Sequence, residues 1–130
     1  MNKTKMPFGY HLMIDCYNCN KKIIDSISNC YDFLDQLVDY INMTKQAPPY
    51  IFRTPKEYIV KSGLSGGVPL VESGISILTL TKKQFVSIDV YSCSQFSIEK
   101  VKKFVSIFFK TTDLELNFVQ RGTKYYQKTQ

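Results

Sequence analysis

The sequence predicts an α+β two-layer sandwich, in which an antiparallel sheet packs against two helices on one face. Apolar residues recur at helical spacing in two stretches, 31–43 and 97–110. The remaining apolar stretches are short, rich in β-branched and aromatic residues, and bounded by turn formers, as strands are. The order strand, helix, strand, then hairpin, helix and strand is typical of this fold class. With 130 residues, 44% of them hydrophobic, the chain can build one core, so residues 1–130 are expected to form a single domain.

The first strand and first helix have clear boundaries in the sequence. Residues 8–17 are apolar and β-rich and end at the turn former Asn18, which predicts a strand. Residues 31–43 place their apolar side chains on one helical face, and Asp32 or Asn29 is expected to cap the start. A pair of prolines beyond this stretch ends the helix.

The middle of the chain alternates extended segments and turns. Residues 50–60 look extended but are interrupted at Pro55, as in an edge strand. The glycine-rich segment 61–67 is predicted to be a flexible turn. Two further strands, 68–80 and 84–91, are separated by a short polar turn and therefore predict a hairpin.

The last third of the chain predicts a helix, a strand and a loose end. Residues 97–110 carry an apolar stripe with lysines opposite, and Ser97 is the expected N-cap. Residues 113–122 alternate apolar and polar side chains and are expected to close the sheet. The tail, 123–130, is expected to be frayed.

The charge of the chain gives little direction about partners. The net charge is +6 with a pI near 9.1, but the lysines are scattered, as on a solvated surface. No nucleic-acid motif accompanies them, so a nucleic acid polymer is not expected as a partner. No apolar run approaches the roughly 20 residues of a membrane span, and the start lacks the apolar core of a signal peptide. We expect a cytoplasmic protein without a membrane partner.

The four cysteines fit free thiols better than disulfides in a chain of this composition. Cys16 and Cys19 have the spacing of metal ligands. No second cysteine pair accompanies them and the chain has one histidine, so a structural thiol pair is expected rather than a metal site.

Five short motifs occur in a characteristic order. They are Gly9-x-His11, Gly63-Leu64-Ser65-Gly66, Glu72-Ser73-x-x-Ser76-Ile77, Ile88-Asp89-Val90-Tyr91-x-Cys93 and Arg121-Gly122. This arrangement resembles the short prokaryotic S-adenosylmethionine decarboxylases over nearly the whole chain, apart from a small insertion around residues 46–56. The family fold is a two-layer sandwich. The family's sheets commonly associate and build sites between protomers, so the resemblance also implies a homo-oligomer.

The resemblance implies a self-processing reaction at the bond between Glu72 and Ser73. In the family the serine hydroxyl attacks the preceding carbonyl, an ester forms, and elimination leaves a pyruvoyl group that serves as the electron sink for decarboxylation. By position, Ser73 is the pyruvoyl precursor and Glu72 ends the upstream fragment. Ser65 matches the serine that assists processing, and Cys93 matches the general acid.

The chain departs from the family pattern directly after Ser73. The family motif is Glu-Ser-His-x-Ser-x-His, whereas this chain has Gly74 and Leu78 at the two histidine positions. The second histidine transfers a proton during ester elimination, and leucine has no titratable proton. The only histidine, His11, lies at a position that the family uses structurally. We therefore expect Ser73 to remain a serine and the cofactor to be absent, with a pyruvoyl from Ser73 only if the chain is a decarboxylase.

An intact chain points to a lyase that needs no electron sink. The substrate's own carboxylate would attack its γ-carbon and release homoserine lactone and a methylthioadenosine product, with catalysis by orientation and desolvation. Glu72 would hold the substrate ammonium or face the sulfonium, and Tyr58 or Tyr91 would orient the methionine side chain of the substrate. This S-adenosylmethionine lyase is our first functional hypothesis.

The basic surplus extends this hypothesis to a nucleotide conjugate of S-adenosylmethionine. An example is SAM-AMP, a second messenger in some CRISPR antiviral defence systems, whose phosphodiester would be held by basic side chains. The candidates are Arg53, Lys56, Lys61 and Arg121. Two alternatives stay open: a self-processing pyruvoyl-dependent decarboxylase in polyamine synthesis, and an inert ligand-binding or regulatory paralogue.

Overall fold

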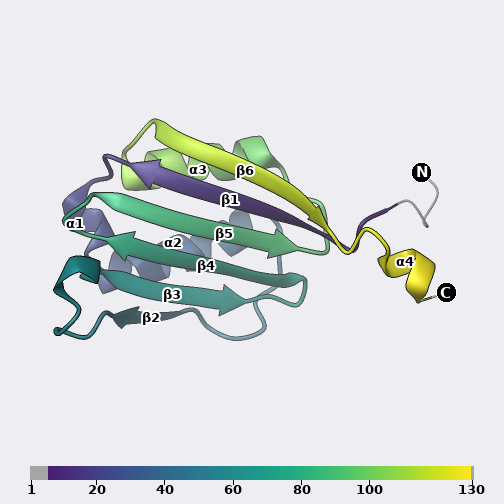
Figure 1. The fold of residues 1–130 in the computed structure, drawn as a ribbon, viewed down its shortest axis with the longest axis horizontal. Helices are drawn as coiled ribbons and strands as arrows, with labels where there is room; N and C mark the ends of the chain where they lie inside the picture. Colours follow the sequence, from purple (N-terminus) through teal and green to yellow (C-terminus); the bar gives the residue numbers. More distant parts are fainter. Residues whose placement is uncertain (1–5, 130) are drawn as a thin grey trace.

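A six-stranded antiparallel sheet forms one layer of the molecule, and two long helices cover one of its faces (Figure 1). The computed structural model describes residues 6–129. The strands lie in the order β2-β3-β4-β5-β1-β6, and every neighbouring pair is antiparallel. The elements are β1 (Gly9–Tyr17), α1 (Lys21–Ile24), α2 (Ile27–Tyr40), β2 (Tyr50–Arg53), the 3-10 helix η2 (Ile59–Lys61), β3 (Leu64–Pro69), β4 (Ser73–Leu80), β5 (Phe85–Ser92), α3 (Ile98–Phe109), β6 (Asp113–Arg121) and α4 (Tyr125–Lys128). The predicted fold class is confirmed, with the short helices α1 and α4 added to the expected pair.

Strict alternation along the central strands gives the sheet a dry face and an open face. In β1, Leu12 and Ile14 are fully buried against the helices, whereas His11 and its alternate neighbours are half-buried on the opposite side. In β5, Val90 is buried while Tyr91 is half-buried. Successive side chains of a strand point to opposite faces, so this period of two sends the polar residues of β1 and β5 to the same side.

The layer of helices is held by an aromatic cluster. Phe33 of α2 is fully buried, and its ring centroid lies 4.7 Å from that of Phe109 and 5.3 Å from that of Phe108. Phe104 completes the contact between α2 and α3 at 5.7 Å. The large rings bury apolar area and pack edge to face for Phe33 with Phe108 and tilted for the other two pairs, which stabilises the pairing of the two helices.

The cap of the last long helix was predicted correctly and that of the first was not. The Ser97 side chain accepts a hydrogen bond from the Lys100 N–H at 3.1 Å, as expected at the start of α3. The start of α2 is capped by Ser26, which accepts from the Asn29 N–H, and not by Asp32 or Asn29 themselves. The apolar pattern begins later than the helix because much of its first turn is exposed to solvent.

The predicted flexible turn at 61–67 is wrong, because most of it belongs to β3. Leu64–Pro69 pairs with β2 on one side and β4 on the other. A Cβ on Gly66 would lie 2.2 Å from the carbonyl oxygen of Tyr50. Glycine here permits close approach of the neighbouring strand rather than flexibility. The strand predicted at 68–80 is therefore the end of β3, a tight turn, and β4.

The tail is more ordered than expected. Residues 125–128 form α4, and the Tyr125 ring packs edge-on against Phe8 at 4.7 Å. Gln130 lies outside the described residues. None of the helices within residues 6–129 is long and apolar enough to cross a membrane.

Replacing Phe33 with alanine should destabilise the fold strongly. The change removes a fully buried ring from the contact of α2 with α3 and leaves a cavity, which costs about 3–5 kcal/mol of unfolding free energy. Chemical denaturation measures the loss. The matched control is Ile107→Ala, because this α3 side chain is 66% exposed and its truncation should cost less than about 0.5 kcal/mol. Equal losses for both variants would contradict the assignment of Phe33 to the core.

Candidate active site

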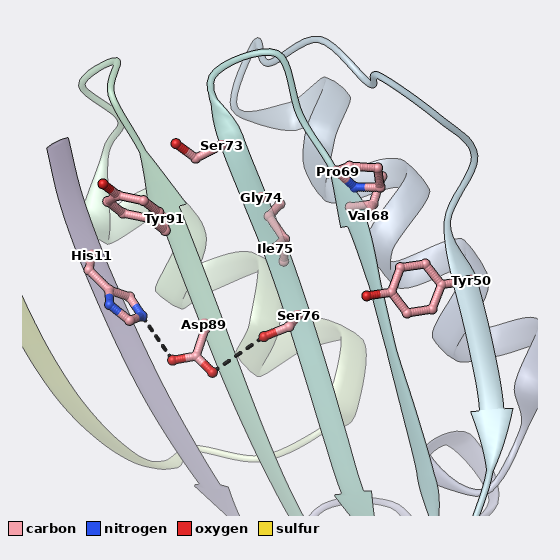
Figure 2. A pocket seen from close by; sticks show the side chains of 10 residues that line it. All are labelled: His11, Tyr50, Val68, Pro69, Ser73, Gly74, Ile75, Ser76, Asp89 and Tyr91. Atoms are coloured by element: carbon pink, nitrogen blue, oxygen red, sulfur yellow. Dashed lines mark hydrogen bonds and ion pairs between the residues drawn. The ribbon is translucent and has the colours of Figure 1, made fainter. Parts of the chain in front are cut away.

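A hollow of about 740 Å³ opens on the uncovered face of the sheet. It lies towards the end of the sheet where β3 turns into β4, and Figure 2 shows the side chains around it. The walls combine apolar and polar groups from β1, β2, β3, β4 and β5. The lining residues are His11, Tyr50, Val68, Pro69, Ser73, Gly74, Ile75, Ser76, Asp89 and Tyr91.

A hydrogen-bonded chain of three side chains crosses the floor of this hollow (Figure 2). Asp89 lies on β5 between the strands of the other two, and its Oδ1 is 2.9 Å from Nε2 of His11. Its Oδ2 accepts from the Ser76 hydroxyl at 3.4 Å. His11, at a position that the family uses structurally, therefore lines the candidate site.

The Tyr91 ring is fixed by contacts on several sides. The Arg121 guanidinium lies over the ring at 4.4 Å from its centroid, and the His11 ring is tilted against it at 5.8 Å. The ring also covers Gly9, where an added Cβ would lie 2.9 Å from Tyr91 Cε1. Gly9 thus creates the space that the ring occupies, and Arg121 joins the edge of the site through a cation–π contact.

The peptide bond between Glu72 and Ser73 lies in a tight hairpin turn beside the hollow. Leu70 and Ser73 exchange two backbone hydrogen bonds, of 3.0 and 3.2 Å, which close the turn. The backbone N–H of Cys93 donates to the carbonyl oxygen of Glu72 at 2.9 Å. The carbonyl next to the Ser73 hydroxyl is thereby polarised, and Cys93, whose side chain is exposed, lies next to this bond.

The Glu72 carboxylate is bound by the loop after α2. Its Oε1 accepts from the Thr44 N–H at 3.0 Å, and the Val71 N–H donates back to the Thr44 carbonyl at 2.9 Å. Glu72 is absent from the described residues that line the hollow. Its side chain fixes the turn and is not placed to hold a substrate ammonium there.

Ser65 and Leu78 face each other across β3 and β4 on the open face. They line a second, smaller hollow of about 370 Å³ that shares Tyr50, Ser76 and Asp89 with the first. Leu78 is 40% exposed. The position of the family's second histidine is therefore at the site, and an aliphatic side chain fills it.

The remaining predicted binding residues lie at the other end of β3. Tyr58 and Lys61 belong to η2 and its cap, which precede β3, whereas Ser73 follows its far end. Arg53 donates to the Asp25 carboxylate at 2.8 Å, and this bond is the main cause of the lowered pKa of Asp25. Lys56 lies in the same connection between β2 and η2. Only Arg121 of the basic candidates approaches the hollow.

Sequence reasoning assigned no site role to Tyr50, Ser76 or Asp89. For Ser76 and Asp89 the signal existed, because period-two alternation in two paired strands sends both to the polar face. Tyr50 reaches the hollow from the edge strand β2, and Figure 2 shows its hydroxyl pointing back towards β4. Finding it required the pairing of β2 with β3, which the predicted turn at 61–67 concealed.

The cysteine pair lies away from this site in the core. Cys16 and Cys19 are fully buried free thiols. A hydrogen bond with Cys19, followed by burial, raises the pKa of Cys16. Within residues 6–129 no cluster of histidine, cysteine and acidic side chains has the arrangement of a metal site.

Comparison with known proteins identifies the family. A model of the S-adenosylmethionine decarboxylase family matches residues 10–122. The chain belongs to the S-adenosylmethionine decarboxylase family. It is 26% identical over 110 residues to the S-adenosylmethionine decarboxylase proenzyme of Clostridium botulinum, covering 82% of this chain and 90% of that one. The proenzyme of a Sulfurihydrogenibium species is 31% identical over 111 residues, covering 85% and 75%.

A solved structure has the same fold. The adenosylmethionine decarboxylase from Aquifex aeolicus superposes with a TM-score of 0.75 at 22% identity, covering 90% of this chain and 92% of that one. The predicted family resemblance is confirmed. The family consists of enzymes that act on S-adenosylmethionine.

The lyase hypothesis, with or without a nucleotide conjugate as substrate, is wrong. The similar proteins are named as decarboxylases, which favours the decarboxylase alternative. The structure gives a physical reason, because the Glu72 carboxylate that the lyase required in the pocket is bound to Thr44. The basic residues proposed for a phosphodiester are mostly at the far end of β3.

Gly9→Ala should disturb the site through Tyr91. The new methyl group would overlap Tyr91 Cε1 and the Ser92 carbonyl, so the ring must move off Arg121 at a cost of about 1–3 kcal/mol. Chemical denaturation and the ring proton shifts of Tyr91 measure the two effects. Gly74→Ala is the control, because its nearest neighbour would lie at an ordinary 3.5 Å. Unchanged Tyr91 shifts in Gly9→Ala would show that the ring does not depend on this glycine.

Proposed function

We propose that this protein is a self-processing, pyruvoyl-dependent S-adenosylmethionine decarboxylase. The observation that carries the proposal is the hydrogen bond from the Cys93 N–H to the Glu72 carbonyl oxygen, beside the Ser73 hydroxyl. The names of the similar proteins support the same reaction. The decarboxylase accounts for the site better than a lyase does, because the Glu72 carboxylate that a lyase would need in the pocket is bound to Thr44.

The Cys93 N–H is placed to assist the first step of processing. When Ser73 Oγ attacks the Glu72 carbonyl carbon, negative charge develops on the oxygen that accepts this bond. A fixed donor at such an oxygen is worth about 10²–10³ in rate. The turn between Leu70 and Ser73, together with the contacts of Thr44 to Val71 and Glu72, keeps the reacting peptide in place.

The residues around Ser73 fit a pyruvoyl group at this position. The group would supply a carbonyl electron sink for loss of the substrate carboxylate. Ser73 borders the hollow, where Pro69 and the rings of Tyr50 and Tyr91 contribute apolar surface, and the side chains of Val68 and Ile75 are buried in the core behind it. The family resemblance gives the Cys93 thiol the role of acid, and the bond to Glu72 places its backbone beside this centre.

A second candidate is an unprocessed protein that binds S-adenosylmethionine without turnover. Gly74 and Leu78 favour this second candidate, because neither residue can transfer a proton at the positions where the family has histidines. Loss of a positioned acid or base costs about 10²–10⁴ in rate. For the primary proposal this means slow processing, and for the second candidate it means none.

Intact mass spectrometry of the purified protein tests the proposal. We expect the full chain to convert slowly into two fragments, with the upstream one ending at Glu72 and the downstream one beginning with a pyruvoyl group in place of Ser73. Incubation with S-adenosylmethionine should then release carbon dioxide. A chain that keeps its full mass after prolonged incubation, yet binds S-adenosylmethionine, would establish the second candidate instead.

Two variants bracket this measurement. Ser73→Ala removes the attacking hydroxyl and should remain intact. The double variant Leu78→His with Gly74→His restores both family side chains and should accelerate cleavage by about 10²-fold or more. Fragments appearing from Ser73→Ala at the rate of the natural chain would mean that an outside protease cuts the turn.

A further inference from the structure

The hollow contains a concentrated negative charge that processing at Ser73 does not use. Among the described residues that line it, Asp89 is the one acidic side chain, and no lysine or arginine accompanies it. The Asp89 side chain is 45% exposed, so its carboxylate is accessible from the hollow. It also lines the smaller hollow, which places it where the two meet.

The neighbours of Asp89 hold it in one orientation and add no fixed positive charge. His11 Nε2 and the Ser76 hydroxyl occupy one lone-pair direction on each carboxylate oxygen, at 2.9 and 3.4 Å. Further along this face, burial and then the charges of Glu115 and Asp89 raise the pKa of Asp15. Acidic side chains therefore gather around Asp89 on this part of the open face, and the nearest basic group named at the site, Arg121, lies over Tyr91 at its edge.

We propose that Asp89, held by His11, binds the sulfonium centre of S-adenosylmethionine. The proposal rests on the proposed function, which places the amino group of the substrate at residue 73. A carboxylate at the meeting point of two apolar-walled hollows attracts a cation that itself forms no hydrogen bonds, because the attraction is Coulombic. Tyr50, on β2 and separated from Asp89 by β3 and β4, adds an aromatic side chain to the wall of the same hollow.

The spacing along β4 favours the sulfonium over the ammonium as the partner of Asp89. Asp89 pairs with Ser76, and three residues of strand, roughly 10 Å, separate Ser76 from Ser73. An amino group joined at residue 73 is therefore remote from this carboxylate. The sulfonium is several bonds beyond that amino group in the substrate, so a substrate that extends along the hollow brings it closer to Asp89 than the ammonium.

Calorimetric binding of two matched ligands tests the assignment. S-adenosylhomocysteine has the ammonium, carboxylate and adenosyl groups of S-adenosylmethionine but lacks the methyl group and the sulfonium charge. The full chain carrying Ser73→Ala, which prevents turnover, should bind S-adenosylmethionine more tightly than S-adenosylhomocysteine. Adding Asp89→Asn should weaken S-adenosylmethionine by about five- to tenfold and change S-adenosylhomocysteine by less than about twofold.

Asp15→Asn is the matched electrostatic control. It removes an acidic group from the same open face at a position outside the hollow and should leave the preference between the two ligands unchanged. His11→Phe should reduce that preference because Asp89 loses its donor. His11→Gln, which retains an N–H donor, should restore part of it. A merely structural role of His11 would lower both affinities together.

The outcomes separate this proposal from the proposed function. If both ligands bind and Asp89→Asn weakens them equally, or weakens neither, Asp89 does not bind the sulfonium and the decarboxylase proposal is untouched. If neither ligand binds the Ser73→Ala chain, the role assigned to Asp89 fails, while the proposed function still stands or falls with the processing of the natural chain. A loss confined to S-adenosylmethionine supports the role of Asp89 and leaves the choice between decarboxylase and binding protein to the mass and carbon dioxide measurements.

Discussion

The pairing of β5 between β1 and β4 is the constraint on which the whole site depends. It brings His11, Asp89 and Ser76 from three strands into one hydrogen-bonded line, and it sets Tyr91 beside Gly74. A slip of one residue in either register would turn these side chains into the helical layer. The buried positions on the other face, Leu12 and Val90 among them, hold the register because such a slip would expose them.

Local patterns in the sequence were sufficient for most of the fold. The β-rich composition of 8–17, the hairpin strand at 84–91, the helical spacing in 97–110 and the cap at Ser97 all correspond to observed elements. The interpretation failed where a residue type has two physical uses. The glycines of 61–67 signal flexibility in a turn, but here they relieve contact between adjacent backbones, which only the tertiary pairing of β2 and β3 reveals.

The site was partly predictable for a related reason. Ser73 and Tyr91 were found because they belong to recognisable motifs, and both line the hollow. The orientation of the Glu72 carboxylate could not be predicted, because it depends on the backbone N–H of Thr44. That residue is distant in sequence and no local pattern indicates the contact. Arg53 and Lys61 were chosen for charge alone, and charge does not specify at which end of a strand a side chain lies.

The position of the Glu72–Ser73 bond within the strand order has a consequence for the integrity of the molecule. Of the strands before this bond, β1 lies between β5 and β6, which follow it, and β3 pairs with β4. A nick in the turn would therefore divide the covalent chain without creating a separable piece, because each half contributes strands flanked by strands of the other. Both halves also supply the buried rings of the helical layer, Phe33 from one and Phe109 from the other. The nicked protein would remain one folding unit, and its halves would part only when the entire sheet came undone.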